Sequence, residues 1–236
     1  TAAQTMAGKP LIIRTLDVGG DKKLPTLELP HEDNPFLGFR AIRMTLSHPE
    51  IFRPQLRAIL RAAAYGDVRV MFPMIGSMDQ LREAKALLRE QEQTLQAEGV
   101  PTGPVKVGMM VEIPAAAVLA EEFAKEVDFF SIGTNDLTQY TLAVERGNAA
   151  VAHLYAPEHP AVLRLIAMTA QAAAERHIPC GMCGEAAGDP KLAPAFVGMG
   201  VNELSMSPRR VPAVRKLLSE LTMDECRQAA EKLLHP

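Results

Sequence analysis

The chain has 236 residues, a formal net charge of −3 and a hydrophobic content of 47%. This length can bury one sizeable core, and the even mixture of charges argues against a nucleic-acid-binding surface or an acidic tail. The apolar runs fall short of the ~20 residues that span a bilayer, and three cysteines make no disulfide framework. We therefore expect one cytoplasmic domain over residues 1–236, with no nucleic-acid partner and no membrane insertion.

Six short apolar runs have the composition of parallel strands that are covered on both faces. In chain order they are residues 10–16, 68–74, 105–113, 127–132, 179–182 and 201–205. Segments of helical period separate them. A strand followed by a helix, six times over, predicts an α/β fold with a parallel sheet and right-handed crossovers.

The segments between the strands carry helix signals. Residues 79–98 repeat apolar positions at helical spacing and stop at Gly99, a residue suited to a helix end. Residues 1–8 have the character of the end of a helix. Other helix starts are predicted by a proline or a capping pattern: Pro160, Asp189-Pro190, Ser207-Pro208 and Thr222–Glu225.

The polar residues at the ends of the predicted strands favour a barrel over an open sheet. The chain has no Gly-x-Gly-x-x-Gly turn, the mark of one large class of open sheets. In a barrel, by contrast, the site draws on the carboxyl ends of many strands. We therefore predict a TIM-type (β/α)8 barrel, of which this chain supplies about six units and lacks the first part.

Carboxylates follow two consecutive predicted strands. Glu112 lies at the end of residues 105–113, and Gly133-Thr134-Asn135-Asp136 follows residues 127–132. Hard cations such as Mg²⁺ take one or two protein carboxylates and complete their octahedron with substrate oxygens and water. The sequence therefore predicts a magnesium site at Glu112 and Asp136. The alternative is that both carboxylates cap nearby backbone amides.

Three arginines are candidates for binding an anionic substrate, because guanidinium offers paired donors to phosphate or carboxylate. Arg14 ends the first predicted strand and is followed by Gly19 and Gly20, which allow close backbone approach to a ligand. Arg40 and Arg146 are the other two. Taken singly, each arginine also fits an ordinary surface position.

Cys180 and Cys183 have the C-x-x-C spacing of redox and zinc motifs. No second pair is present for zinc, and the motif lies at a strand end, whereas thioredoxin-like motifs open a helix. Side chains three apart on a strand point to opposite faces. Cys183 is therefore either a buried small residue or an acid at the mouth of a site.

Six stretches of the chain resemble the phosphoenolpyruvate-binding domain of Enzyme I of the bacterial sugar phosphotransferase system. They are residues 14–22, 34–40, 71–74, 111–115, 128–148 and 181–185. The resemblance implies an eight-stranded barrel of which this chain supplies strands three to eight. It also implies Mg²⁺ (or Mn²⁺) bound by Glu112 and Asp136, and Cys183 as proton donor to the enolate. The substrate-binding positions that it implies are Arg14, Arg40, Asn135, Asp136 and Arg146.

The resemblance further implies phosphoryl transfer from phosphoenolpyruvate to a histidine, with release of pyruvate. That histidine belongs to a separate amino-terminal domain, which passes the group to an HPr-type phosphocarrier protein, and the parent protein is expected to be a homodimer. Another substrate-binding arginine of the family lies upstream of Thr1, so the chain alone is expected to be inactive. Three alternatives stay open: a phosphoenolpyruvate synthase or dikinase fragment, a magnesium-dependent pyruvate aldolase or lyase, and a non-catalytic module for phosphoenolpyruvate binding and dimerisation.

Overall fold

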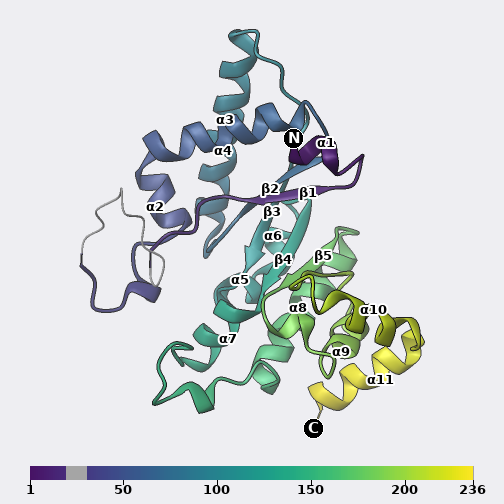
Figure 1. Cartoon of the computed structure of the whole chain (residues 1–236). Helices are drawn as coiled ribbons and strands as arrows, with labels where there is room; N and C mark the ends of the chain where they lie inside the picture. Colours follow the sequence, from purple (N-terminus) through teal and green to yellow (C-terminus); the bar gives the residue numbers. More distant parts are fainter. Residues whose placement is uncertain (20–30, 236) are drawn as a thin grey trace. The chain divides into compact units, whose positions relative to one another are not determined.

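The computed structural model describes residues 1–19 and 31–235. Part of the stretch that resembles Enzyme I, Gly20-Asp21-Lys22, lies outside the described residues. The chain divides into two compact units, Thr1–Met109 and Met110–Pro236, which follow one another in the colours of Figure 1. The assignment of residues 1–236 to one domain stays a prediction.

The first unit is built on parallel strands. Leu11 pairs with Val68 and Arg14 with Met71, and on the other side of the second strand Phe72 pairs with Met109. The strands are β1 (Leu11–Arg14), β2 (Val68–Phe72) and the first four residues of β3 (Lys106–Val111), whose last two residues belong to the second unit. The helices and 3-10 turn of this unit are α1 (Ala2–Thr5), η1 (Pro35–Leu37), α2 (Ile42–Ser47), α3 (Pro49–Ala63) and α4 (Met78–Ala97).

Helix α4 shows how local signals set the elements of this unit. Ser77 precedes the helix, and its hydroxyl accepts a hydrogen bond from the Gln80 amide at 3.3 Å, which satisfies one of the open donors of the first turn. The predicted stop at Gly99 is confirmed by its φ of +68°. Helices α3 and α4 pack together, and Phe52 of α3 meets Phe72 of β2 edge to face at 6.1 Å. A close-packed apolar core thus lies behind β2.

The second unit has the same strand-then-helix order. Phe130 pairs with Cys180 and Gly133 with Cys183, while Met182 pairs with Leu204, all in parallel. The strands are β4 (Phe129–Gly133), β5 (Cys180–Cys183) and β6 (Glu203–Leu204). The remaining elements are α5 (Pro114–Val118), α6 (Ala120–Phe123), α7 (Thr134–Leu142), η2 (Ala152–Leu154), α8 (Pro160–Glu175), η3 (Ala186–Gly188), α9 (Ala193–Gly198), α10 (Val211–Ser219) and α11 (Met223–Leu234).

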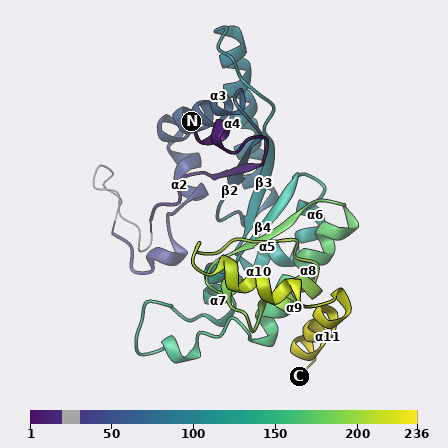
Figure 2. The same ribbon diagram turned by 45° about the vertical axis from the view of Figure 1, so that its right-hand side comes forward.

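Helices cover the strands of the second unit. Helix α8 packs on β4 and β5, and α11 packs on α9, which is labelled near it in Figure 2. The predicted capping box of α11 is confirmed: the Thr222 hydroxyl accepts from the Glu225 amide, and the Glu225 carboxylate accepts from the Thr222 amide. Helix α8 starts at Pro160, as predicted, and the His159 ring nitrogen accepts from the Ala161 amide. Among the described residues, no helix is long and apolar enough to cross a membrane.

The six predicted strands are all present, and within each unit they lie in chain order. The α/β class is therefore confirmed. Most are shorter than their apolar runs, because an apolar residue beyond the last ladder hydrogen bond still packs in the core without being part of the strand. Residues 201–205, for example, contain a strand only at Glu203–Leu204, although Val201 is buried.

Two predicted helix starts are wrong. The Asp189 carboxylate accepts from the Lys191 amide at 2.8 Å, which closes a turn, and α9 begins only at Ala193. Likewise the Ser207 carbonyl accepts from the Arg210 amide at 2.9 Å, and α10 begins at Val211. An aspartate or serine before proline stabilises a turn as readily as a helix start, and here the turn is formed.

Candidate active site

In the first unit, Asp17 links two of the predicted substrate-binding arginines. Arg14 is the last residue of β1, and its Nη1 lies 3.2 Å from Asp17 Oδ2. Arg40 Nη2 donates to the other oxygen, Oδ1, at 3.0 Å. The side chains of Asp17 and Arg40 are fully buried, whereas that of Arg14 is 38% exposed. The structure thus brings Arg14 and Arg40 to one carboxylate.

The backbone around Gly19 and Arg40 is in close contact. Gly19 has a φ of +105°, and a Cβ placed there would lie 2.9 Å from Arg40 Cα and 3.0 Å from the Phe39 carbonyl oxygen. The Ala41 amide donates to the Val18 carbonyl at 2.9 Å, and this hydrogen bond holds the same two backbone segments together. Only glycine accepts both this φ and this spacing. At Gly19 the close approach is to the chain itself, and the predicted approach to a ligand stays a prediction.

In the second unit, Glu112 follows β3 and is 1% exposed. A Cβ on Gly133, the last residue of β4, would lie 2.9 Å from Glu112 Oε2. Asp136 comes three residues later, in the first turn of α7, and is 6% exposed. Both predicted metal ligands are therefore buried carboxylates at the carboxyl ends of their strands.

Strands β4 and β5 are joined at their ends by neutral hydrogen bonds. Thr134 Oγ1 donates to the Cys183 carbonyl at 2.9 Å, and Asn135 Oδ1 accepts from the Glu185 amide at 3.1 Å. Between them Gly184 has a φ of +98°, and a Cβ there would contact Thr134 Oγ1 and lie 2.9 Å from Asn135 Oδ1. We call Thr134, Asn135 and the turn Cys183-Gly184-Glu185 the strand-end junction.

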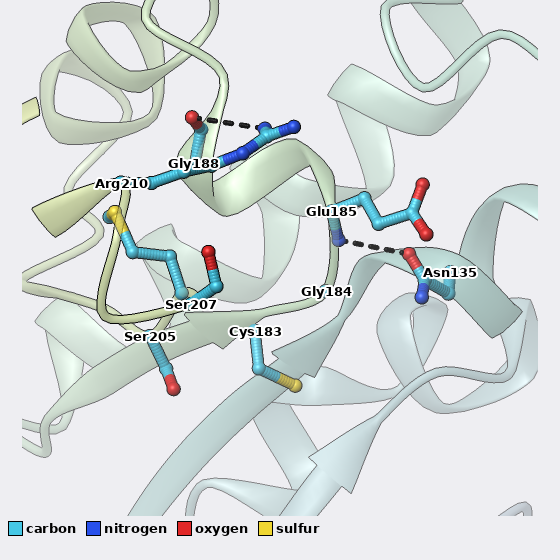
Figure 3. A pocket seen from close by; sticks show the side chains of 9 residues that line it. Asn135, Cys183, Gly184, Glu185, Gly188, Ser205, Ser207 and Arg210 are labelled. Atoms are coloured by element: carbon cyan, nitrogen blue, oxygen red, sulfur yellow. Dashed lines mark hydrogen bonds between the residues drawn. The ribbon is translucent and has the colours of Figure 1, made fainter.

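A cavity of about 460 Å³ opens beside this junction. Figure 3 shows the Cys183 side chain at its edge, with Asn135 and Glu185 together on one side, joined by their hydrogen bond. The other residues that line the cavity are Gly188, Ser205, Met206, Ser207 and Arg210. Cys183 is thus partly exposed at the mouth of a cavity, and its role as an acid stays a prediction.

The two cysteines of the C-x-x-C pair differ in their burial. Cys180 is 1% exposed, and burial raises the pKa of its thiol to about 12. Cys183 is less buried and lines the cavity, and among the described residues neither thiol forms a disulfide. This agrees with the expected divergence of two side chains three apart on a strand.

Tyr155 is a site residue that sequence reasoning missed. Its hydroxyl donates to the Asn135 carbonyl at 3.2 Å. Burial raises the pKa of this phenol, a hydrogen bond with Thr138 and the charge of Arg146 oppose that shift, and the charges of Glu185 and Asp136 add to it. The charges of Arg146 and Asp136, two predicted substrate-binding residues, therefore act on the same hydroxyl.

Some further residues described above could also have been found from the sequence. Ser205 ends the last predicted strand and Ser207 lies two residues beyond it, so the rule that located Glu112 and Asp136 also applies to them. Asp17 lies in the loop after β1 and fits that rule too. Tyr155 and Arg210 carry no such signal, because they reach the site from loops whose path depends on the folded chain.

The donor set of Glu112 and Asp136 fits a hard cation. Both are carboxylates, both are buried, and both belong to the second unit. Among residues 1–19 and 31–235, no three His, Cys, Asp or Glu side chains gather as a metal site. Glu112 and Asp136 offer two carboxylates, and Mg²⁺ takes one or two carboxylates from a protein.

Comparison with known proteins adds the family. A family model described as the phosphoenolpyruvate-binding domain of phosphoenolpyruvate-utilising enzymes matches residues 1–223. The chain is 53% identical over 235 residues to phosphoenolpyruvate-protein phosphotransferases of Bacillus sp. (strain S) and Geobacillus stearothermophilus, and 52% identical to that of Bacillus subtilis (strain 168). These alignments cover 99% of this chain but only 41% of each relative, so the chain spans about two fifths of their length.

Solved structures of other proteins share the fold. A citrate lyase from Burkholderia xenovorans LB400 matches with a TM-score of 0.54 and 22% identity, covering 78% of this chain and 58% of that chain. Malate synthase of Haloferax volcanii matches with a TM-score of 0.52 and 15% identity, covering 74% of this chain and 52% of that chain. At these identities the likeness concerns the fold alone, and it agrees with the predicted partial α/β barrel.

Proposed function

Because the chain belongs to the family of phosphoenolpyruvate-binding domains of phosphoenolpyruvate-utilising enzymes, we propose that it is this domain of a phosphoenolpyruvate-protein phosphotransferase. In that role it binds phosphoenolpyruvate and supports transfer of the phosphoryl group to a histidine of a separate domain, with release of pyruvate. The observation that carries the proposal is the cavity that meets the thiol of Cys183 and the carboxamide of Asn135 at the ends of two adjacent strands. The identity to phosphotransferases favours this role over a synthase or dikinase fragment.

In phosphoryl transfer the protein mainly positions the reacting groups and stabilises the charge on the transferred phosphoryl group. The bond between phosphorus and the enol oxygen breaks, the phosphoryl group passes to the histidine nitrogen, and an enolate stays behind. Arg14, Arg40 and Arg146 offset the charges of phosphate and carboxylate. Cys183 then gives its proton to the enolate carbon to form pyruvate, and the thiolate regains a proton from water.

Glu112 and Asp136 would hold a divalent cation, Mg²⁺ or Mn²⁺, in this proposal. When bound, the ion supplies positive charge to the phosphate and carboxylate oxygens of the substrate. Their position, buried just beyond the carboxyl ends of β3 and β4, supports this role.

The partners in the proposal follow from the phosphotransferase role. They are the phosphohistidine domain of the same parent protein and an HPr-type phosphocarrier protein, and the parent is a homodimer in the cytoplasm. The 41% coverage of the phosphotransferase relatives leaves length in those proteins for a histidine domain.

The metal assignment tests the proposal in the full-length protein that contains this chain. We expect Asp136→Asn to raise the Mg²⁺ concentration needed for half-maximal pyruvate release by at least about 10-fold, since one of two carboxylate ligands is lost. Asp128→Asn is the matched control: it removes the same charge from an exposed position at the other end of β4. An unchanged Mg²⁺ requirement in Asp136→Asn would contradict the assignment, and a wild-type protein that releases no pyruvate would contradict the function.

A further inference from the structure

The carboxylate of Asp17 contacts two arginines through separate oxygens. Oδ2 lies 3.2 Å from Arg14 Nη1, and Oδ1 accepts from Arg40 Nη2 at 3.0 Å. Neither of the roles assigned above, substrate binding or metal binding, includes Asp17. Its carboxylate nevertheless lies within ion-pair distance of both guanidinium groups.

Burial makes this arrangement rigid. The side chains of Asp17 and Arg40 are completely buried, and the Arg40 guanidinium also lies over the Phe36 ring, 5.8 Å from its centre. Removing one partner of a buried ion pair leaves the other charge poorly solvated, so both groups are held strongly in place. Arg14, by contrast, is 38% exposed and can offer its remaining donors to a ligand.

The charges of the three side chains sum to +1. A site for a phosphorylated carboxylate needs such an excess, but it also needs donors at fixed positions, because paired hydrogen bonds depend on geometry as well as charge. Asp17 lowers the positive charge and yet can improve the site by orienting its donors. These two effects have opposite signs, which makes them separable by experiment.

We propose that Asp17 is a positioning residue for phosphoenolpyruvate binding, with one carboxylate oxygen orienting Arg14 and the other orienting Arg40. The inference rests on the proposed function, since it assumes that the two arginines bind this substrate. Asp17 acts through the arginines and has no contact with the reacting atoms in this scheme.

The test is Asp17→Asn in the full-length protein, with KM for phosphoenolpyruvate, kcat and the melting temperature as readouts. Asparagine keeps the shape and removes the charge. If only net charge mattered, the variant would bind the anion more tightly. We expect weaker binding, with KM raised at least about 10-fold, as for other residues that orient a ligand's direct partners.

Asp67→Asn is the matched control, because Asp67 pairs with Arg69 at 2.8 Å in the same unit, next to the amino end of β2. The control loses the same charge and an ion pair, and its KM should change by less than about 2-fold. The rise caused by Asp17→Asn should also shrink when Arg14→Gln is already present, because Asp17 then has one arginine fewer to orient. A purely structural defect would add to the effect of Arg14→Gln in full.

An unchanged or lowered KM in Asp17→Asn, or a rise that is equally large beside Arg14→Gln, would overturn the proposal. Should Asp17→Asn fail to fold, Asp17→Glu gives the same test, since it keeps the charge and displaces the oxygens by one methylene. Its KM is expected to rise, and a wild-type KM would overturn the inference. A wild-type protein without phosphoenolpyruvate-dependent activity would instead contradict the proposed function, so the two failures are distinguishable.

Discussion

The Arg14–Asp17–Arg40 cluster of the first unit and the strand-end junction of the second hold site residues by different forces. In the cluster, a buried carboxylate positions two cations through ion pairs. In the junction, hydroxyl and carboxamide groups bind the backbone around a glycine, and no ion pair joins these five residues. The cluster positions long flexible side chains, and the junction positions a short one by fixing its backbone.

Because the forces differ, the two regions should be sensitive to different kinds of substitution. A long arginine side chain can point in many directions, so a charge partner is needed to select one of them. The Cys183 side chain has few positions once its backbone is fixed, and neutral hydrogen bonds suffice. The cluster should therefore be sensitive to changes of charge, and the junction should be sensitive to changes of volume.

The largest effect on stability is expected from Arg40→Met. Methionine keeps much of the apolar stem but leaves the buried Asp17 carboxylate with one cation fewer, which costs about 3–5 kcal/mol of unfolding free energy. Arg14→Met, at a partly exposed position of the same cluster, should cost no more than about 1 kcal/mol. Urea unfolding of both variants measures the difference. Equal losses of unfolding free energy would show that the deeper burial of Arg40 has no effect on stability.

A smaller effect is expected from Gly184→Ala in the junction. The added Cβ would contact Thr134 Oγ1, and the φ of +98° disfavours any side chain, so the unfolding free energy should fall by about 2–4 kcal/mol. Gly99→Ala is the control, because its φ is +68° but its Cβ would meet nothing within 4 Å, and it should lose about 1–2 kcal/mol. If both variants lost the same unfolding free energy, the contact between the added Cβ and Thr134 would contribute nothing to the loss.

The smallest effect is a pH dependence of stability that comes from a buried thiol at the start of β5, the strand that leads into the junction. Burial raises the pKa of the Cys180 thiol from 9.0 to about 12. Below pH 9 both folded and unfolded chains keep the proton. Between these values only the unfolded chain loses it, so stability should fall with rising pH by about 1.4 kcal/mol per pH unit. Unfolding of the wild type and Cys180→Ala at pH 8 to 10 measures this, and identical slopes would count against a buried protonated thiol.

Much of the fold could be predicted because it depends on local patterns. Each of the six apolar runs contains a strand where its backbone pairs with a neighbouring strand. The capping box at Thr222 needs only four consecutive residues. Asp189 and Ser207 were predicted as helix starts and form turns instead. The same side chain can cap a helix or close a turn, and the choice depends on how the following segment packs.

From the sequence alone we could predict the α/β class, the order of the six strands and the candidate residues Glu112, Asp136 and Cys183, because each of these depends on apolar runs and the polar residues that end them. Only the folded chain shows that the Arg40 side chain is fully buried and shares Asp17 with Arg14, and that the Tyr155 hydroxyl donates to the Asn135 carbonyl. Such pairings join residues that are far apart along the chain or lie in loops. Their formation depends on burial and on the path of the folded backbone, which no local pattern of residues contains.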